Sequence, residues 1–313
     1  MQKKKMKFHF APVQGHTDAP YRHYHHHIYG NDLTYYTPFI RLEEGKLRKR
    51  DIKDFTSSLN SEAPNVPQII FRDEKELVAL IDLMKQQEVT KLNLNMGCPF
   101  PLQTGHGRGA ATVANEDLAK AVRKIITDNP DINFSVKIRL GMIAPDEWKV
   151  LMPYLNDTHI SHLAVHPRVA RQQYSGELYL DQFNEILTQS VNPVVYNGEI
   201  HTPHDIQRIT LLFPEIEGIM IGRGLLGRPS LINEATSGNE WPREKRLEMM
   251  LKFHQELLNH YTEELCGDTQ IISKIKPFWE YAEEEIGRKA WKAIKKAGNI
   301  AKYHSAVALI TQQ

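Results

Sequence analysis

Short segments of apolar, β-branched or aromatic residues alternate with helical stretches from residue 8 to residue 221. These segments are 8–13, 33–39, 66–71, 91–96, 134–140, 162–166, 193–197 and 218–221. Helical periodicity lies between them, for example at 74–87 and at 115–127, where Asn115 is a suitable N-cap. Eight strands alternating with helices over ~220 residues predict a (β/α)8 TIM barrel, an α/β fold whose usual length is ~250 residues.

An open, doubly wound sheet is the alternative arrangement of such units. It is disfavoured because no G-x-G-x-x-G motif follows the first strand, and because polar residues follow many strands rather than one switch point. Beyond Trp241 the pattern becomes helical, at 243–261, 271–285 and 287–309, with a break at 266–268. We therefore expect a barrel domain at 1–239 and a small all-α helical-bundle domain at 240–313.

The composition excludes several classes of protein. Hydrophobic residues make up 41% and charged residues 25% of the 313 residues, which is typical of a globular protein. No apolar run approaches the ~20 residues of a membrane span, and no apolar segment of signal-peptide type follows the basic start of the chain. We expect a cytoplasmic monomer without membrane contact, in which Cys98 and Cys266 form no disulfide.

Two clusters of residues invite a metal or nucleic-acid interpretation. His23, His25, His26 and His27 have no cysteine or carboxylate at ligand spacing, so we expect a solvated helix face and no bound metal. Near the end of the chain, basic residues follow one another without an intervening acid. They are Arg288, Lys289, Lys292, Lys295, Lys296 and Lys302. With a net charge of only +1, this run is either a solvated helix face or a local phosphate-binding surface.

Polar residues gather at the ends of the predicted strands. They are Gln14, Gln68, Asn95 with Cys98, Lys137 with Arg139, His166 with Arg168, Asn197-Gly198-Glu199 and Gly222-Arg223-Gly224. In a TIM barrel these positions share one mouth, where the catalytic groups of this fold lie. Cys98 follows an alternating strand and lies in a glycine and proline turn, which favours a reactive role over that of a small buried hydrophobic residue.

The last two strands indicate a phosphate-bearing ligand. Glycines follow both of them directly, where barrels bind phosphate through backbone N–H groups, and Arg223 offers a charge-assisted contact. Lys137 could place a cation against a ring that gains negative charge on reduction. The motifs themselves leave flavin mononucleotide (FMN) and a phosphorylated substrate as alternatives.

Together these residues resemble the tRNA-dihydrouridine synthase family. The matching motifs are Ala11-Pro12-Val13-Gln14-Gly15-His16-Thr17-Asp18, Asn95-Met96-Gly97-Cys98-Pro99, Val136-Lys137-Ile138-Arg139-Leu140-Gly141, His166-Pro167-Arg168 with Tyr174-Ser175-Gly176, Asn197-Gly198-Glu199-Ile200 and Met220-Ile221-Gly222-Arg223-Gly224. The resemblance implies an FMN-bearing barrel and a helical RNA-binding domain that reduce the C5–C6 bond of a tRNA uridine, with NADPH or NADH as reductant.

The resemblance also implies roles for individual residues. Cys98 would deliver a proton to C5 while FMN N5 passes hydride to C6. The implied cofactor-binding residues are Pro12, Val13, Gln14, Gln68, Lys137, His166, Asn197, Gly198, Glu199, Gly222 and Arg223. The implied uracil- or tRNA-binding residues are Arg41, Asn95, Arg168, Tyr174, Lys274, Lys276, Tyr281, Lys292, Lys295 and Lys296. The segment 267–279, with Arg41, resembles the bacterial subfamily that modifies uridine 16 of the D-loop.

Two other functions stay open on the residues alone. An FMN barrel could act on a free small molecule, as a dihydroorotate-type dehydrogenase does, although the basic helical tail argues against it. A catalytically silent RNA-binding protein could keep the barrel, although the retention of Cys98 and the flavin positions argues against that.

Overall fold

The structure, a computed structural model, describes residues 5–30 and 32–312 and contains a closed parallel barrel. Its strands are β1 (Lys7–Phe10), β2 (Leu33–Tyr36), β5 (Asn65–Val66), β6 (Gln68–Ile69), β7 (Lys91–Met96), β8 (Asn133–Arg139), β9 (Leu163–His166), β10 (Val194–Tyr196) and β11 (Gly218–Ile221). Neighbouring strands pair in parallel in the order β5-β2-β1-β11-β10-β9-β8-β7-β6. The predicted TIM barrel is confirmed, and every predicted strand is present.

The third strand of the barrel is interrupted at Pro67. Proline has no backbone N–H to donate to a strand ladder, so this strand is split into β5, which pairs with β2, and β6, which pairs with β7. The Pro67 carbonyl still accepts the Asn93 N–H at 2.9 Å. The two short pieces therefore act as one strand that closes the barrel.

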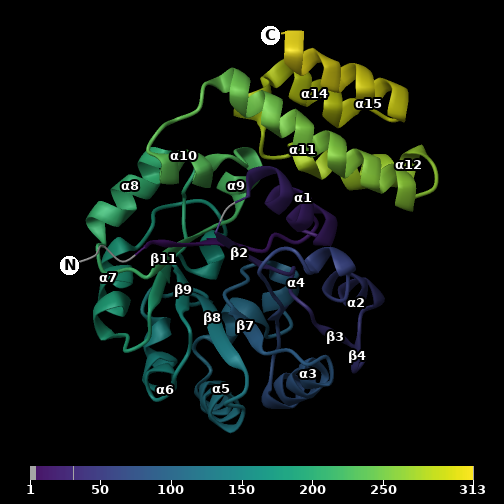
Figure 1. Ribbon diagram of the computed structural model, residues 1–313. Helices are drawn as coiled ribbons and strands as arrows, with labels where there is room; N and C mark the ends of the chain where they lie inside the picture. Colours follow the sequence, from purple (N-terminus) through teal and green to yellow (C-terminus); the bar gives the residue numbers. More distant parts are fainter. Residues whose placement is uncertain (1–4, 31, 313) are drawn as a thin grey trace.

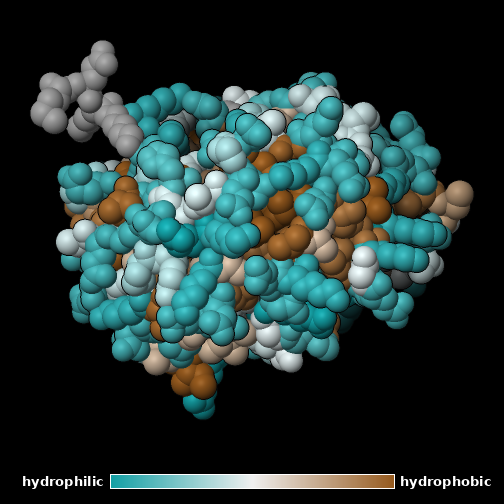
Figure 2. All heavy atoms as spheres, turned by 90° about the horizontal axis from the view of Figure 1, so that it is seen from below, coloured by the Kyte–Doolittle hydropathy of each residue, from teal (hydrophilic) through white to brown (hydrophobic). Residues whose placement is uncertain are grey.

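Helices cover the outside of the barrel (Figure 1). They are α1 (Ala19–Tyr29), α2 (Lys49–Phe55), α3 (Glu74–Gln86), α4 (Pro101–Thr104), α5 (Glu116–Asp128), α6 (Met152–Asn156), α7 (Leu180–Gln189), α8 (Pro203–Leu212), α9 (Arg223–Gly227) and α10 (Leu231–Ser237), and a small hairpin, β3 (Leu42–Glu43) and β4 (Lys46–Leu47), follows β2. Asn115 caps α5 by accepting the Leu118 N–H at 3.0 Å, as predicted. Figure 2 shows hydrophilic side chains over most of one face, with hydrophobic ones between them.

The C-terminal region is helical, as predicted, but more finely divided. Its helices are α11 (Arg243–Glu264), α12 (Asp268–Ile275), α13 (Glu283–Ile286), α14 (Arg288–Lys296) and α15 (Ile300–Val307). The single predicted helices at 271–285 and 287–309 are wrong. Pro277 follows the end of α12 and lacks the N–H that a continuing helix needs. Asn299 caps a new helix by accepting the Lys302 N–H.

The helical region packs against the barrel through the β1–α1 loop, and α11 lies beside α1 (Figure 1). The Asp18 carboxylate accepts the Tyr261 hydroxyl at 3.0 Å and pairs with the Lys274 ammonium at 3.0 Å. His16 Nε2 lies 2.9 Å from a Glu280 carboxylate oxygen. The predicted boundary at 239/240 falls between α10 and α11, and the division into two separate domains stays a prediction.

The histidine run is only partly the solvated face that we predicted, because His27 is exposed, His23 and His26 are half-buried and His25 is buried. His25 is fully buried, with Nδ1 2.7 Å from the Tyr35 hydroxyl and Nε2 3.2 Å from the Pro229 carbonyl oxygen. Burial lowers the pKa of His25 to about 3, so the ring stays neutral. The prediction failed for His25 because α11, which is remote in sequence, packs on this side of α1. In the described part of the chain, no helix has the length and apolar character of a membrane span.

Candidate active site

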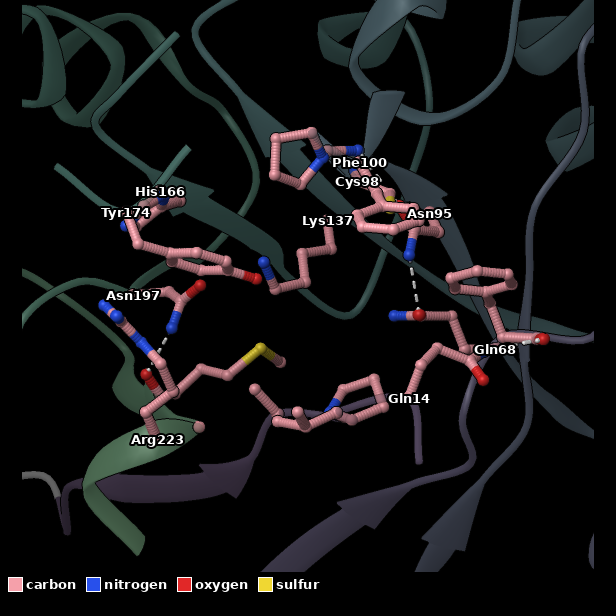
Figure 3. A pocket seen from close by; sticks show the side chains of 18 of the residues that line it. Gln14, Gln68, Asn95, Cys98, Phe100, Lys137, His166, Tyr174, Asn197 and Arg223 are labelled. Atoms are coloured by element: carbon pink, nitrogen blue, oxygen red, sulfur yellow. Dashed lines mark hydrogen bonds between the residues drawn. The ribbon is translucent and has the colours of Figure 1, made fainter. Parts of the chain in front are cut away.

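A cavity of about 520 Å³ opens at the carboxyl ends of the barrel strands. It contains Cys98, Asn95, Arg41, Tyr174, Tyr281 and every predicted cofactor-binding residue, namely Pro12, Val13, Gln14, Gln68, Lys137, His166, Asn197, Gly198, Glu199, Gly222 and Arg223. Figure 3 shows Gln68 and Lys137, which come from β6 and β8, reaching toward the same space, with Asn197 and Arg223 on its other side. The strand pattern therefore located the mouth of the barrel correctly.

Lys137 brings a cation into this cavity because of the two-residue period of β8. Val136 and Ile138 are buried outward against the helices, and Lys137 points inward between them. Burial, and then the nearby Arg139 cation, lowers the pKa of Lys137 to about 8. Within the described residues its ammonium has no carboxylate partner and no hydrogen-bond acceptor, so it is free for an electron-rich ligand.

Asn95 connects the cavity to the Cys98 loop. Its Oδ1 accepts the backbone N–H groups of Gly97 at 3.1 Å and of Cys98 at 2.9 Å, and its Nδ2 donates to Gln68 Oε1 at 2.7 Å (Figure 3). Gly109 packs on the same loop with φ +62°, where a Cβ would lie 2.6 Å from the Cys98 carbonyl oxygen. The loop is thus held from both sides.

Burial raises the pKa of the Cys98 thiol. The Lys137 and Arg139 cations oppose this effect but do not overcome it. Cys98 therefore keeps its proton at neutral pH, which suits an acid and not a thiolate nucleophile.

A cluster of charged side chains lies across the cavity from the Cys98 loop (Figure 3). Glu199 accepts from Arg168 at 2.5 Å and from Arg223 at 2.8 Å, and its other oxygen lies 3.2 Å from His201 Nε2. The His201 contact, followed by the two arginines, lowers the pKa of Glu199 to about 2. The Arg223 guanidinium also stacks on the Tyr174 ring at 4.2 Å. This arrangement holds Arg223 in one place while leaving the cluster cationic.

His166 is buried beside these cations. Burial, and then the charge of Arg139, lowers the pKa of His166 well below its usual range. The ring is therefore neutral, so it can take part in hydrogen bonds or packing but contributes no positive charge. The backbone of Gly198 approaches it closely, because a Cβ there would lie 3.2 Å from His166 Cδ2.

Several predicted tRNA residues do not line the cavity. Arg168 lies beneath it, holding Glu199 and the Gly176 carbonyl. Lys274 pairs with Asp18, and Lys276 donates to the carbonyls that end α14, those of Lys295 and Ala297. On α14 itself, three predicted lysines are exposed. They are Lys292, Lys295 and Lys296.

Several other residues without a predicted role also line the cavity. Among these are Phe39, Arg48, Phe100 and Met220. Met220 could have been found from alternation along β11, because it lies two residues before Gly222 on the inward side. Phe39 and Arg48 come from the region of the β3–β4 hairpin, where the sequence has no periodic pattern to place them.

Comparison with known proteins identifies the family. The family model described as "Dihydrouridine synthase (Dus)" matches residues 9–309. The chain belongs to the dihydrouridine synthase family.

Curated members of this family are distant in sequence. A relative named tRNA-dihydrouridine synthase B, from Shewanella oneidensis, is 29% identical over 168 residues, 53% of this chain and 52% of its own length. A relative named as a probable tRNA-dihydrouridine synthase, from Helicobacter pylori, is 24% identical over 90% of this chain and 84% of its own length. The chain thus spans about half the length of the first of these relatives.

Solved structures show the fold of the dihydrouridine synthase barrel in other proteins. The old yellow enzyme from Trypanosoma cruzi has a TM-score of 0.54 and is 7% identical, covering 75% of this chain and 89% of that structure. Similarity at this identity establishes the shared barrel architecture.

The buried ammonium of Lys137 should make the stability of this protein depend on pH. Its folded pKa of about 8 lies below the ordinary value of 10.5, so the unfolded chain binds more protons between these pH values. The penalty of the buried charge is fully present below pH 8 and disappears as the pH rises to 10.5. Lys137→Met should therefore raise the free energy of unfolding at pH 7 by about 1 to 3 kcal/mol, and by much less at pH 10.5.

Urea unfolding of the ligand-free protein at the two pH values measures this difference. Lys75→Met, which replaces an exposed lysine of α3, is the control and should change little at either pH. An equal effect of Lys137→Met at pH 7 and pH 10.5 would contradict the assignment of the pH dependence to this ammonium.

Proposed function

We propose that this enzyme reduces the C5–C6 bond of a uridine in the D-loop of tRNA to 5,6-dihydrouridine, with FMN as cofactor and NADPH or NADH as reductant. The observation that carries the proposal is the position of the Cys98 thiol at the mouth of the barrel, where burial raises its pKa, in a chain that belongs to the dihydrouridine synthase family. The names of the curated relatives support tRNA as the substrate.

The residues of the cavity fit FMN chemically. Lys137 supplies a cation without a protein partner for the ring, and Gln68 presents an amide beside it. Arg223, fixed by Glu199 and Tyr174, supplies charge for the phosphate end. Pro12, Val13 and Met220 add an apolar wall for a flat aromatic ring. When bound, FMN would supply the hydride for C6 of the uracil.

The protein's own groups would orient the uracil and move the proton. Asn95 lies next to both the cavity and the Cys98 loop, so it can hold the base while the thiol faces C5. Cys98 would donate its proton to C5 as an acid. Since a stacked uridine cannot reach this depth, the nucleotide must leave the tRNA stack, at a cost of a few kcal/mol.

The tRNA would lie across the mouth and the helical region. Arg41, Tyr174 and Tyr281 line the mouth, and Lys292, Lys295 and Lys296 offer exposed charge on α14. The assignment of Arg168, Lys274 and Lys276 to tRNA stays a prediction, and the partners that these three have within the protein favour positioning roles. We propose uridine 16 as the modified position, on the resemblance of 267–279 and Arg41 to that subfamily.

The purified protein is expected to be yellow and to bind one FMN noncovalently. Absorbance at visible wavelengths and titration of the ligand-free protein with FMN, followed by flavin fluorescence, measure this. A colourless protein whose titration shows no saturable FMN site would refute the cofactor assignment.

The reaction itself is tested with tRNA from a strain that lacks dihydrouridine synthases. Incubation with FMN-loaded protein and NADPH should produce dihydrouridine in the D-loop, mapped by nucleotide position. Dihydrouridine at a position other than 16 would refute the subfamily and spare the function. FMN-dependent turnover of dihydroorotate without any reaction on tRNA would instead favour a small-molecule dehydrogenase.

A further inference from the structure

A row of buried polar side chains continues below the cavity into the barrel. Gln68, Asn93 and Ser135 are direct neighbours in the register of β6, β7 and β8. Gln68 Nε2 donates to Asn93 Oδ1 at 2.7 Å, and Asn93 Nδ2 donates to Ser135 Oγ at 2.7 Å. Gln68 and Asn93 are 0% exposed and Ser135 is 3% exposed. With Asn95 above them, these side chains form one hydrogen-bonded row that ends at the Cys98 loop.

The direction of every amide in this row follows from its upper end. Asn95 Oδ1 faces two backbone N–H groups, those of Gly97 and Cys98, and an amide NH2 could not replace it there. Asn95 must therefore turn its NH2 toward Gln68, and Gln68 must offer its oxygen in return. The Gln68 NH2 is left to donate one N–H to Asn93 Oδ1. Figure 3 shows this amide nitrogen on the cavity side of Gln68.

Asn93 completes this ordering from below. Its Oδ1 takes one N–H of the Gln68 amide, which leaves the second N–H as the group offered to the cavity. Ser135 Oγ accepts from the Asn93 NH2 and so supports Asn93 in that orientation. An apolar side chain at position 93 would leave the Gln68 amide held by Asn95 alone, and an apolar side chain at position 135 would leave the Asn93 amide without its lower partner.

We propose that Asn93 and Ser135 are positioning residues that hold the Gln68 amide with an N–H donor facing the cavity. This inference rests on the proposed function, because the donor would meet a flavin ring there. The polar edge of a flavin carries carbonyl acceptors, so an amide N–H in this place favours binding and an amide oxygen opposes it. The row also links the donor to the position of the Cys98 loop, since Asn95 belongs to both.

A double-mutant cycle on FMN affinity tests the proposal without any measurement of activity. Asn93→Leu, close to asparagine in shape, should raise the FMN dissociation constant of the ligand-free protein about tenfold. The same substitution in a Gln68→Leu background should have no further effect, because Asn93 acts through Gln68. Asn93→Asp keeps an oxygen toward Gln68 and should restore most of the affinity that leucine loses.

Ser135→Ala is a second and smaller change that removes only the hydroxyl group. It should lower FMN affinity about threefold, and this loss should also vanish in the Gln68→Leu background. It replaces Asn93→Leu if thermal unfolding followed by circular dichroism shows that the leucine variant does not fold. Ser161→Ala is the matched control, because Ser161 donates to the Phe134 carbonyl and lies outside the row. It should leave FMN affinity unchanged.

Two results would overturn the inference while sparing the proposed function. FMN affinity equal to that of the wild type in both the Asn93 and Ser135 variants would show that the row does not position Gln68. Equal losses with and without Gln68 would show a general structural effect. A wild-type protein without an FMN site would refute the proposed function, and the inference with it, whereas a normal wild-type titration confines any failure to the row.

Discussion

Cys98→Ala is expected to lower the rate of dihydrouridine formation in tRNA by about 10²- to 10⁴-fold, the usual contribution of a positioned general acid. FMN affinity and NADPH oxidation in the absence of tRNA should remain close to those of the wild type. The thiol, whose pKa is raised by burial, would donate a proton and would have no part in holding the cofactor. Single-turnover reduction of tRNA by the pre-reduced enzyme measures the step directly.

The second cysteine provides the matched control for this experiment. Cys266 is free and exposed at the turn between α11 and α12, away from the barrel mouth. Cys266→Ala should leave every rate unchanged. Wild-type turnover by Cys98→Ala would remove the thiol from the reaction, and a parallel loss of FMN binding would indicate a structural role in the loop.

Replacing Lys292, Lys295 and Lys296 together by alanine is expected to weaken tRNA binding by about 10- to 100-fold near 0.1 M salt. These lysines are exposed on α14, and each ammonium that contacts a phosphate releases a counterion on binding. The slope of log affinity against log salt concentration should fall by about 2 to 3. Filter binding or fluorescence anisotropy over a salt series gives both quantities, and the flavin spectrum should not change.

Three basic residues of another helix serve as the control. Lys120, Arg123 and Lys124 are exposed on α5, which lies at the other end of the molecule from α14 (Figure 1). Their triple alanine variant loses the same formal charge and should keep the wild-type salt slope. If both triple variants lost affinity equally, a general charge effect would replace the docking assignment to α14.

Local patterns sufficed to predict the barrel. The alternation of apolar and polar residues defines a strand such as Lys91–Met96, and a side-chain cap such as Asn115 marks a helix start within a few residues. Contacts between distant segments were beyond such patterns. His25 is polar and lies in a polar run, yet the packing of α11 on α1 buries it. In the helical region, Pro277 is a residue that ends a helix and Asn299 is one that caps a new helix. The predicted long helices ignored both signals.

The candidate site was predictable where each residue follows a strand, because parallel strands bring their carboxyl ends to one mouth. The hydrogen-bonded row beneath the site could not be predicted in this way. Asn93 and Ser135 look like ordinary strand residues, and their partnership depends on the register of β7 against β8, which no sequence period reveals. Lys276 shows that a sequence pattern can also suggest a partner that the side chain does not need. A lysine near a basic helix suggests RNA binding, whereas in the structure its ammonium donates to two backbone carbonyls of this chain.

Tyr281 comes from the helical region and yet lines the cavity of the barrel. It can do so because Gly227 has no side chain, since a Cβ there would lie 2.7 Å from the Tyr281 carbonyl oxygen. A chimera that joins this barrel to the tail of a relative would therefore exchange part of the cavity wall together with the tRNA-facing helices. Tails could be exchanged between family members only along with their counterparts of Gly227, His16 and Asp18, so the two regions are expected to change together over evolution rather than as separate modules.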